Sequence, residues 1–240
     1  MVQTIYIFIL SYFVLGGLGF YFINRKKEKE VARKSWTKFI AYFFIINILF
    51  FSIVINPLAF QVLTGLIITV GLFELFRLLK NDSYKQGGFF ALSVVVFGAL
   101  SYGFWRFSIM EKEIILFTFL ILSIFDAFSQ ISGQLWGKRK IAPEISPNKT
   151  IGGTVGGAIF AMLSAFFLKS FTNAGTIDTL LLAVGIIAFA FVGDIAASFY
   201  KRKFGVKDYS NLIPGHGGFL DRFDSLIAGA AWVALFFCIW

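Results

Sequence analysis

Eight long apolar runs are the feature of this sequence that most restricts its fold. They cover about residues 4–23, 38–56, 59–76, 88–105, 114–132, 153–168, 179–198 and 223–240. A run of roughly 20 apolar residues can cross a bilayer as a helix. The hydrophobic share of the chain, 58%, exceeds what a soluble domain of this size can bury. The sequence therefore predicts an all-α integral membrane protein, a polytopic bundle of about eight transmembrane helices with no soluble domain.

The basic residues fall on alternate connections between these runs. Of the 22 lysines and arginines, 19 lie on one side, and only Arg106, Lys112 and Lys169 lie on the other. Membrane proteins keep positive charge on the cytoplasmic side. Both termini are therefore expected to face outward, which an even number of spans also requires. We expect a multi-pass protein of the cell (inner) membrane with its site on the cytoplasmic side.

The net charge of +9 and the single cysteine exclude other classes of protein. Bases interleaved with apolar runs suit anionic headgroups, so membrane lipids and not nucleic acid are the expected partners. Cys238 leaves neither a disulfide framework nor a thiolate metal site. The first run lacks a basic leader and a small-residue cleavage site, so we expect a retained helix.

The polar segments divide the chain into two regions. Residues 1–110 are predicted to be N-terminal transmembrane helices that serve in anchoring, lipid contact or assembly. Residues 111–240 are predicted to be the catalytic region, with long cytoplasmic loops at 133–152 and 199–222.

Acidic residues interrupt the apolar runs at a single level, near the ends that carry the basic loops. They are Glu74, Asp126, Asp194, Asp221 and Asp224. An acid at mid-membrane costs about 2.5–3.5 kcal/mol on insertion scales, so a shared level favours a functional site. Each acid also has a simpler role: Asp194 could pair with Lys201 or Arg202, and Asp221 and Asp224 could cap a helix.

The spacing of these residues predicts which side chains share a face. Asp194, Ser198 and Lys201 lie at i, i+4 and i+7 on one helical stripe. Asp221 and Asp224 are neighbours on the first turn of the last helix. Facing carboxylates from Asp194 and Asp221, without cysteine, suit Mg²⁺ as the bound metal.

The two polar loops carry glycines and bases suited to phosphate. Residues Pro214, Gly215, His216, Gly217 and Gly218 precede the last helix, where backbone N–H groups can approach an anion. His216 either positions a phosphate or carboxylate or is structural. In the other loop, Lys149 is a candidate phosphate ligand, Ser146 or Asn148 is expected to cap the following helix, and the glycines at 152/156 and 153/157 are expected to pack helices.

One long pattern in the C-terminal half resembles the signature of the phosphatidate cytidylyltransferase (CDP-diacylglycerol synthase) family. It comprises Ser198, Lys201, Arg202, Lys207, Asp208, Ser210, Pro214, His216, Gly217, Gly218, Asp221, Arg222 and Asp224. Ser146-Pro147 with Lys149-Thr150, and Asp126 with Gly133 and Gly137-Lys138, fit the family's upstream pattern. The resemblance covers about residues 115–240; Glu74 fits loosely, and the first two helices carry no specific signal.

The resemblance implies a reaction of CTP with phosphatidic acid that gives CDP-diacylglycerol and pyrophosphate. It implies Mg²⁺ on Asp194 and Asp221, with Ser198, Lys201 and Arg202 on phosphates. The remaining substrate-binding residues that it implies are Ser146, Lys149, Asp126, Lys207, Asp208, His216, Gly217, Gly218, Arg222 and Asp224. A second cation and a homodimer are both compatible with the sequence.

Three positions depart from the family pattern, and two other functions stay open beside a non-catalytic scaffold, which the presence of Asp194, Asp221 and Lys201 disfavours. Gly152 replaces a common Glu, Gln130 replaces a common Tyr, and Tyr200 replaces a commoner aliphatic residue. One alternative is cytidylyl transfer to a different lipid phosphate; the other, from a different class, is an ion-coupled transporter, because intramembrane acids also build ion pathways. A transporter should place its acids near mid-membrane on interrupted helices.

Overall fold

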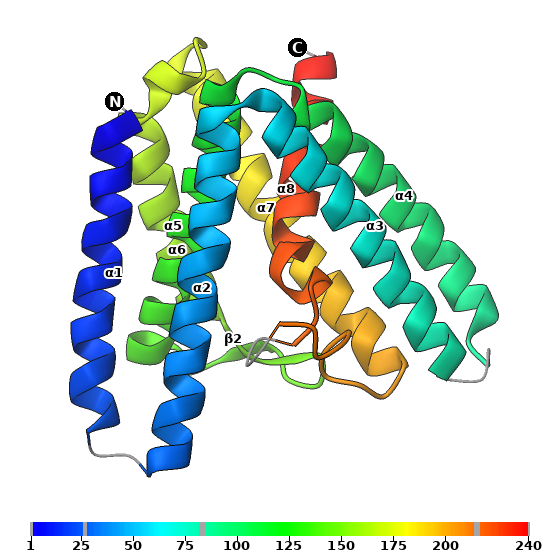
Figure 1. The fold of residues 1–240 in the computed structure, drawn as a ribbon. Helices are drawn as coiled ribbons and strands as arrows, with labels where there is room; N and C mark the ends of the chain where they lie inside the picture. The colour runs from blue at the N-terminus through cyan, green and yellow to red at the C-terminus, as the bar shows by residue number, and fades with distance from the viewer. Residues whose placement is uncertain (1, 26–27, 82–84, 214–216, 240) are drawn as a thin grey trace.

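The computed structural model describes the whole chain except residues 1, 26–27, 82–84, 214–216 and 240. The described residues form eight α-helices, two short strands and one 3₁₀ turn at Lys169–Phe171 (Figure 1). The helices are α1 (Val2–Asn24), α2 (Lys29–Ile55), α3 (Pro57–Asn81), α4 (Gly87–Ser108), α5 (Lys112–Trp136), α6 (Ile151–Phe167), α7 (Thr176–Lys203) and α8 (Leu220–Ile239). Strands β1 (Lys140–Ala142) and β2 (Ser146–Thr150) pair as an antiparallel hairpin between α5 and α6.

Each apolar run of the sequence coincides with one of these helices, which confirms the all-α membrane fold. Among the described residues, α3, α4, α5, α7 and α8 are long and apolar enough to cross a membrane. The apolar parts of α2 (Phe39–Ile55) and α6 are shorter. The total of eight spans therefore stays a prediction.

The polar loops gather at one end of the bundle. In Figure 1, α1 begins and α8 ends at the opposite end from the β-hairpin and the loop that follows α7. This arrangement agrees with an even number of crossings. Which end faces the cytoplasm stays a prediction.

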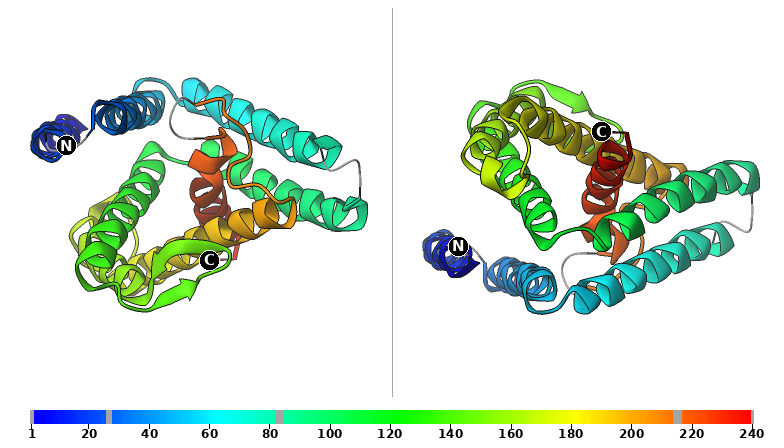
Figure 2. Two further views of the ribbon diagram at one scale, coloured as in Figure 1. Left: turned by 90° about the horizontal axis from the view of Figure 1, so that it is seen from below. Right: turned by 90° about the horizontal axis from the view of Figure 1, so that it is seen from above.

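Helix α8 is the central element of the bundle. It lies among α3, α4, α5 and α7 in both end-on views, whereas α1 lies at the edge beside α2 (Figure 2). Leu226, Ile227, Ala230 and Val233 of α8 are all buried. The first turn of α8 is therefore surrounded by the loop-side ends of several helices.

The glycines of α6 pack directly against α5, as the spacing predicts. A Cβ atom at Gly156 would collide with Ser132, and one at Gly157 would collide with Ser129. At Gly152, the position that departs from the family pattern, a Cβ would lie 2.9 Å from the carbonyl oxygen of Trp136. A side chain at position 152 would therefore require the two helices to move apart.

The cap of α6 is Thr150, so the predicted capping by Ser146 or Asn148 is wrong. The Thr150 hydroxyl accepts the backbone N–H of Gly153 at 3.1 Å. Ser146 and Asn148 lie in β2, which extends up to the helix. The hairpin was not anticipated because its strands are too short to show an alternating pattern.

Candidate active site

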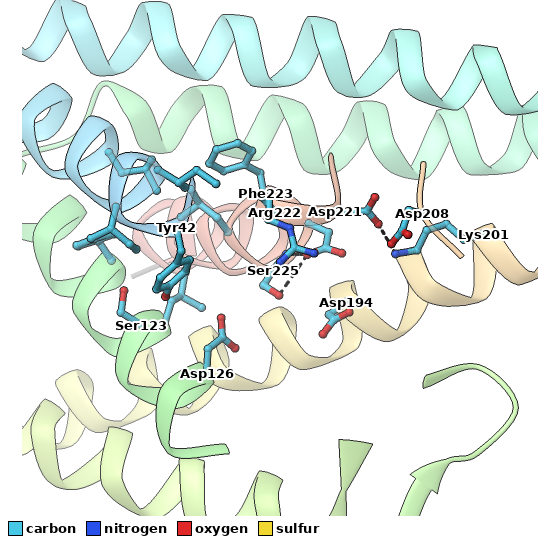
Figure 3. A pocket seen from close by; sticks show the side chains of 17 residues that line it. Tyr42, Ser123, Asp126, Asp194, Lys201, Asp208, Asp221, Arg222, Phe223 and Ser225 are labelled. Carbon is cyan, nitrogen blue, oxygen red and sulfur yellow. Dashed lines mark hydrogen bonds and ion pairs between the residues drawn. The ribbon is translucent and has the colours of Figure 1, made fainter. Parts of the chain in front are cut away.

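A cavity of about 300 Å³ opens among α2, α5, α7 and α8, next to the loop that precedes α8 (Figure 3). Seven of the residues predicted for the site line it: Asp126, Asp194, Lys201, Asp208, Asp221, Arg222 and Asp224. They come from three helices and one loop, so the fold gathers side chains that are almost 100 positions apart in the sequence. The cavity is the structural centre of the predicted site.

Asp221 at the start of α8 is held by three donors. The Lys201 ammonium lies 2.5 Å from its Oδ1, and the side chain of Asp221 is only 1% exposed. Its Oδ2 accepts the backbone N–H groups of Tyr209 at 2.9 Å and Gly218 at 2.8 Å. Asp221 therefore fixes the loop after α7 against α8 and orients the Lys201 ammonium.

Asp194 on α7 is more accessible and pairs with the other polar loop. The Lys149 ammonium lies 2.5 Å from its Oδ2, and the Ser198 hydroxyl donates to its Oδ1 at 3.4 Å. The Asp194 side chain is 32% exposed. Lys149 also lies over the Phe191 ring, 4.7 Å from its centroid. The ion pair that the sequence suggested with Lys201 or Arg202 is replaced by one with Lys149.

Glu74 on α3 is fully buried and caps α8 from a distant part of the chain. Its carboxyl group accepts the backbone N–H groups of Phe219 at 2.9 Å and Leu220 at 2.7 Å, and the Ser210 hydroxyl at 2.5 Å. The first N–H groups of a helix have no partner inside the helix, and an acid there is favourable. The sequence suggested that Asp221 or Asp224 could cap α8. At Phe219 and Leu220 the cap is Glu74 instead.

The glycine segment before α8 approaches the protein's own carboxyl groups. A Cβ at Gly218 would lie 2.8 Å from Glu74 Oε1 and 2.9 Å from Asp221 Oδ2. Gly217 has a positive φ of 85° and a Cβ there would lie 2.9 Å from the Asp208 side chain. The glycines are required for this close packing. The prediction for His216 lies outside the described residues.

Tyr209 packs beside the Lys201–Asp221 pair. Burial, with the nearby Asp224 and Asp221 carboxylates, raises the pKa of the Tyr209 phenol well above its usual value. The phenol donates to the carbonyl of Ala197 at 3.3 Å, and the Lys201 ammonium lies 5.2 Å from the ring centroid. Tyr209 therefore packs between α7 and the Lys201–Asp221 pair as a structural partner.

The other predicted residues that the structure describes do not line the cavity; they are Ser146, Lys149, Ser198, Arg202, Lys207, Gly217 and Gly218. Arg202 is exposed; its Nε donates to Ile145 O at 3.2 Å and its Nη1 to Val206 O at 3.0 Å. Lys207 is exposed in the loop after α7, and Ser146 lies in β2. Arg202 thus joins the two polar loops, and none of the three lines the cavity.

Three polar residues that line the cavity were missed by the sequence analysis. They are Tyr42 on α2, Ser123 on α5 and Ser225 on α8 (Figure 3). Ser123 lies three positions before Asp126, and Ser225 directly follows Asp224. This proximity to predicted site acids could have indicated both serines. Tyr42 lies in a helix without any motif, so only the packing of α2 against α5 reveals it.

The substituted position Tyr200 also has a structural role. Its hydroxyl donates to the carbonyl of Leu75 at 3.2 Å, and its ring stacks with Phe89 and Tyr209. Tyr200 thereby ties α7 to α3 and α4 beside the site.

The acids of the cavity suit a cation that is completed by substrate oxygens. In the part of the chain that the structure describes, no group of three or more Asp, Glu, His or Cys side chains could hold a metal ion. Mg²⁺ in nucleotide sites is commonly held by one or two carboxylates together with phosphates and water. Asp194, which is accessible and accepts one hydrogen bond at Oδ1, fits this role. Both oxygens of the buried Asp221 accept protein donors, so Asp221 would join the cation only if the cation displaced the Lys201 ammonium from Oδ1.

Comparison with known proteins gives consistent matches to one family. The profile described as "Cytidylyltransferase family" matches residues 83–240. A Haemophilus influenzae protein named "Phosphatidate cytidylyltransferase" is 39% identical over 130 residues, which are 52% of this chain and 45% of the relative. Proteins of the same name are 41% identical over 150 residues in Staphylococcus epidermidis and 37% over 147 in Staphylococcus aureus, each covering 60% of this chain and 56% of the relative. The matched part of the chain spans about half the length of these relatives.

Proposed function

Because this chain belongs to the cytidylyltransferase family, we propose that it makes CDP-diacylglycerol and pyrophosphate from CTP and phosphatidic acid. The substrate named by its relatives is a lipid phosphate, and the protein is a helical membrane protein. The observation that carries the proposal is that Asp194, Lys201 and Arg222 line one cavity, into which the start of α8 and the end of α7 both project residues. At this cavity a water-soluble nucleotide and a lipid headgroup can both reach one site.

The chemistry needs little beyond positioning and charge. A phosphate oxygen of the lipid forms a bond to the α-phosphorus of CTP. The bond from that phosphorus to the oxygen that bridges to the β-phosphorus breaks, and its electron pair leaves with pyrophosphate. The attacking oxygen is already anionic near neutral pH, so no strong general base is required. Pre-positioned cationic groups supply the main stabilisation in such a transfer.

The residues of the cavity supply these cationic groups. Asp221 holds the Lys201 ammonium in place, and Asp194 holds Lys149 beside the same cavity. Arg222 lines the cavity from the first turn of α8. We assign all three bases to phosphate oxygens. Mg²⁺ held by Asp194 and Asp221 would neutralise charge on the nucleotide phosphates and the leaving pyrophosphate.

The continuity of the helices that carry the acids argues against an ion-coupled transporter. Asp221 and Asp224 lie near the start of α8, whereas Asp126 and Asp194 lie 10 and 9 residues before the loop-side ends of α5 and α7. The helices α5, α7 and α8 that carry them are continuous. Transporter sites lie near the bilayer midplane on interrupted helices.

The proposed orientation follows from the distribution of positive charge. The basic loops are assigned to the cytoplasmic side, and both termini are assigned to the outer side.

Turnover by purified protein tests the proposal. Protein in detergent micelles is incubated with Mg²⁺, CTP labelled at the α-phosphate and phosphatidic acid, and lipid-extractable label is measured. We expect labelled CDP-diacylglycerol that disappears when EDTA is added. A panel of other lipid phosphates tests the alternative acceptor. Folded protein that labels no lipid phosphate would refute the enzyme assignment.

A further inference from the structure

The cavity of the candidate active site has two chemically different halves. Its charged half faces the polar loops, whereas its other half is lined by side chains of α2, α5 and α8. The residues of this second half are Ile45, Ile46, Leu49, Phe119, Leu122 and Leu226. We call these six residues the apolar arm. A cavity with charges at one end and only apolar side chains at the other is built for an amphipathic ligand.

Helix periodicity shows how the arm is built. On α2, residues 42, 45, 46 and 49 form one stripe, and on α5 residues 119, 122, 123 and 126 form another. The two helices run in opposite directions (Figure 1). Tyr42 therefore shares the polar level with Asp126, and Leu49 shares the apolar level with Phe119. The stripe from Tyr42 to Leu49 rises about 10 Å along α2.

The arm runs in the direction that a lipid tail takes. On α2 it runs from Ile45 to Leu49 toward the end of that helix, and on α5 from Leu122 to Phe119 toward the start of that helix, which are the ends away from the β-hairpin. A lipid whose phosphate lies at the loop-side surface sends its acyl chains the same way into the bilayer. Transfer of an acyl chain out of water is favourable by about 0.8 kcal/mol for each methylene group. A chain that enters the arm from the bilayer leaves lipid and not water, so its free energy changes only through packing contacts. The shape of the arm would therefore select among acyl chains.

We infer that the apolar arm holds an acyl chain of the lipid substrate, whose phosphate lies beside Lys201 and Arg222. This inference rests on the proposed cytidylyl transfer. One wall of the arm is α2, which lies outside residues 83–240 that match the family profile. The N-terminal region of this chain therefore contributes one wall of the acyl-chain site, alongside α5 and α8.

Photolabelling locates the chain without relying on turnover. Phosphatidic acid with a diazirine near the end of one acyl chain is bound to the protein in nanodiscs, irradiated, and mapped by mass spectrometry. We expect label at Ile45, Leu49 and Phe119. If the exposed α2 residues Phe44 and Ile48 were labelled as strongly as the arm residues, the label would report only lipid of the surrounding bilayer, and the inference would be overturned. Label confined to Leu92 and Val96 of α4, which line a neighbouring apolar cavity, would also overturn it.

Two tryptophan substitutions on α2 provide a matched pair. Ile45→Trp fills the arm, whereas Ile48→Trp places the same ring on the exposed face of the same helix, where Ile48 is 55% exposed. We expect Ile45→Trp to reduce arm labelling at least fivefold and to raise KM for a long-chain lipid phosphate at least tenfold. Ile48→Trp should match the unmodified protein. Equal values for the two variants would contradict the inference.

Three controls separate this inference from misfolding and from the proposed function. Ile45→Trp should raise KM for a dihexanoyl lipid phosphate less than for a long-chain lipid phosphate, since the short chains contact less of the arm. Ile45→Ala, which enlarges the arm, should favour bulkier chains if the wall selects them. Arm labelling without CDP-lipid formation would support the chain site and refute the cytidylyl transfer, whereas turnover with scattered label would refute only the chain site.

Discussion

The carboxyl group of Glu74 on α3 accepts the backbone N–H of Leu220, the first residue of α8, at 2.7 Å, across a sequence separation of 146 residues. The same group accepts Phe219 N–H and the Ser210 hydroxyl. A buried acid on α3 therefore fixes the position along the bundle at which α8 begins. Since Asp221 is the next residue, Glu74 positions the Lys201–Asp221 pair although Glu74 does not line the cavity.

Replacing Glu74 by Ala should lower both stability and turnover. The change leaves three donors without this acceptor, and each unsatisfied buried donor costs about 1–3 kcal/mol. Thermal unfolding in detergent should show a lower Tm, with Glu74→Gln intermediate because its amide oxygen keeps part of the network. Thr64→Val is the control, because the Thr64 hydroxyl is buried on the same helix without a hydrogen-bond partner. A Tm for Glu74→Ala equal to that of Thr64→Val would contradict the capping role.

Replacing Lys201 by Met should separate stability from chemistry. Removing one partner of a buried pair costs about 3–5 kcal/mol, because the other charge is left uncompensated. The double variant Lys201→Met/Asp221→Asn should recover much of the Tm, but its turnover should stay at least 100-fold reduced. Lys203→Met, which removes an exposed lysine two positions away, serves as control. Recovery of turnover in the double variant would remove Lys201 and Asp221 from the chemistry.

Replacing Asp194 by Asn should abolish turnover with little effect on stability. Its pair with Lys149 is partly exposed, and such pairs contribute only about 0–1 kcal/mol. The Tm should therefore change little, while CDP-lipid formation falls to background at every Mg²⁺ concentration. Asp178→Asn, near the other end of α7, is the control. Full turnover by Asp194→Asn would refute the assignment of Asp194 to the metal.

Replacing Gly218 by Ala should disrupt the site through crowding. The added methyl would lie within 3 Å of Glu74 Oε1, the Tyr209 Cβ and Asp221 Oδ2, at the 2.8–2.9 Å given by the backbone. We expect lower turnover and a lower Tm. Gly98→Ala on α4 has open space around it and should be neutral or slightly stabilising. Normal turnover by Gly218→Ala would show that the loop before α8 adapts without cost to the site.

The sequence predicted those parts of the molecule that depend on neighbours along the chain. Apolar length predicted the helices, and the i, i+4 spacing predicted the contact of Ser198 with Asp194. The partners of the acids were not predictable in this way. Lys149 reaches Asp194 only because the β-hairpin brings the start of α6 beside α7, and Glu74 reaches Leu220 only because α3 packs beside α8. Tyr42 lacked any signal because the lipid-facing and cavity-facing sides of α2 are equally apolar.

The contacts of Arg202 have a mechanical consequence. Its guanidinium group bonds to Ile145 O in the loop after α5 and to Val206 O in the loop after α7. A force that displaces one loop is therefore transmitted to the other through a single side chain. The hydrogen bond to Ile145 O is the one that joins the two segments, since Arg202 already belongs to α7, and the bond to Val206 O holds the guanidinium group in position for it.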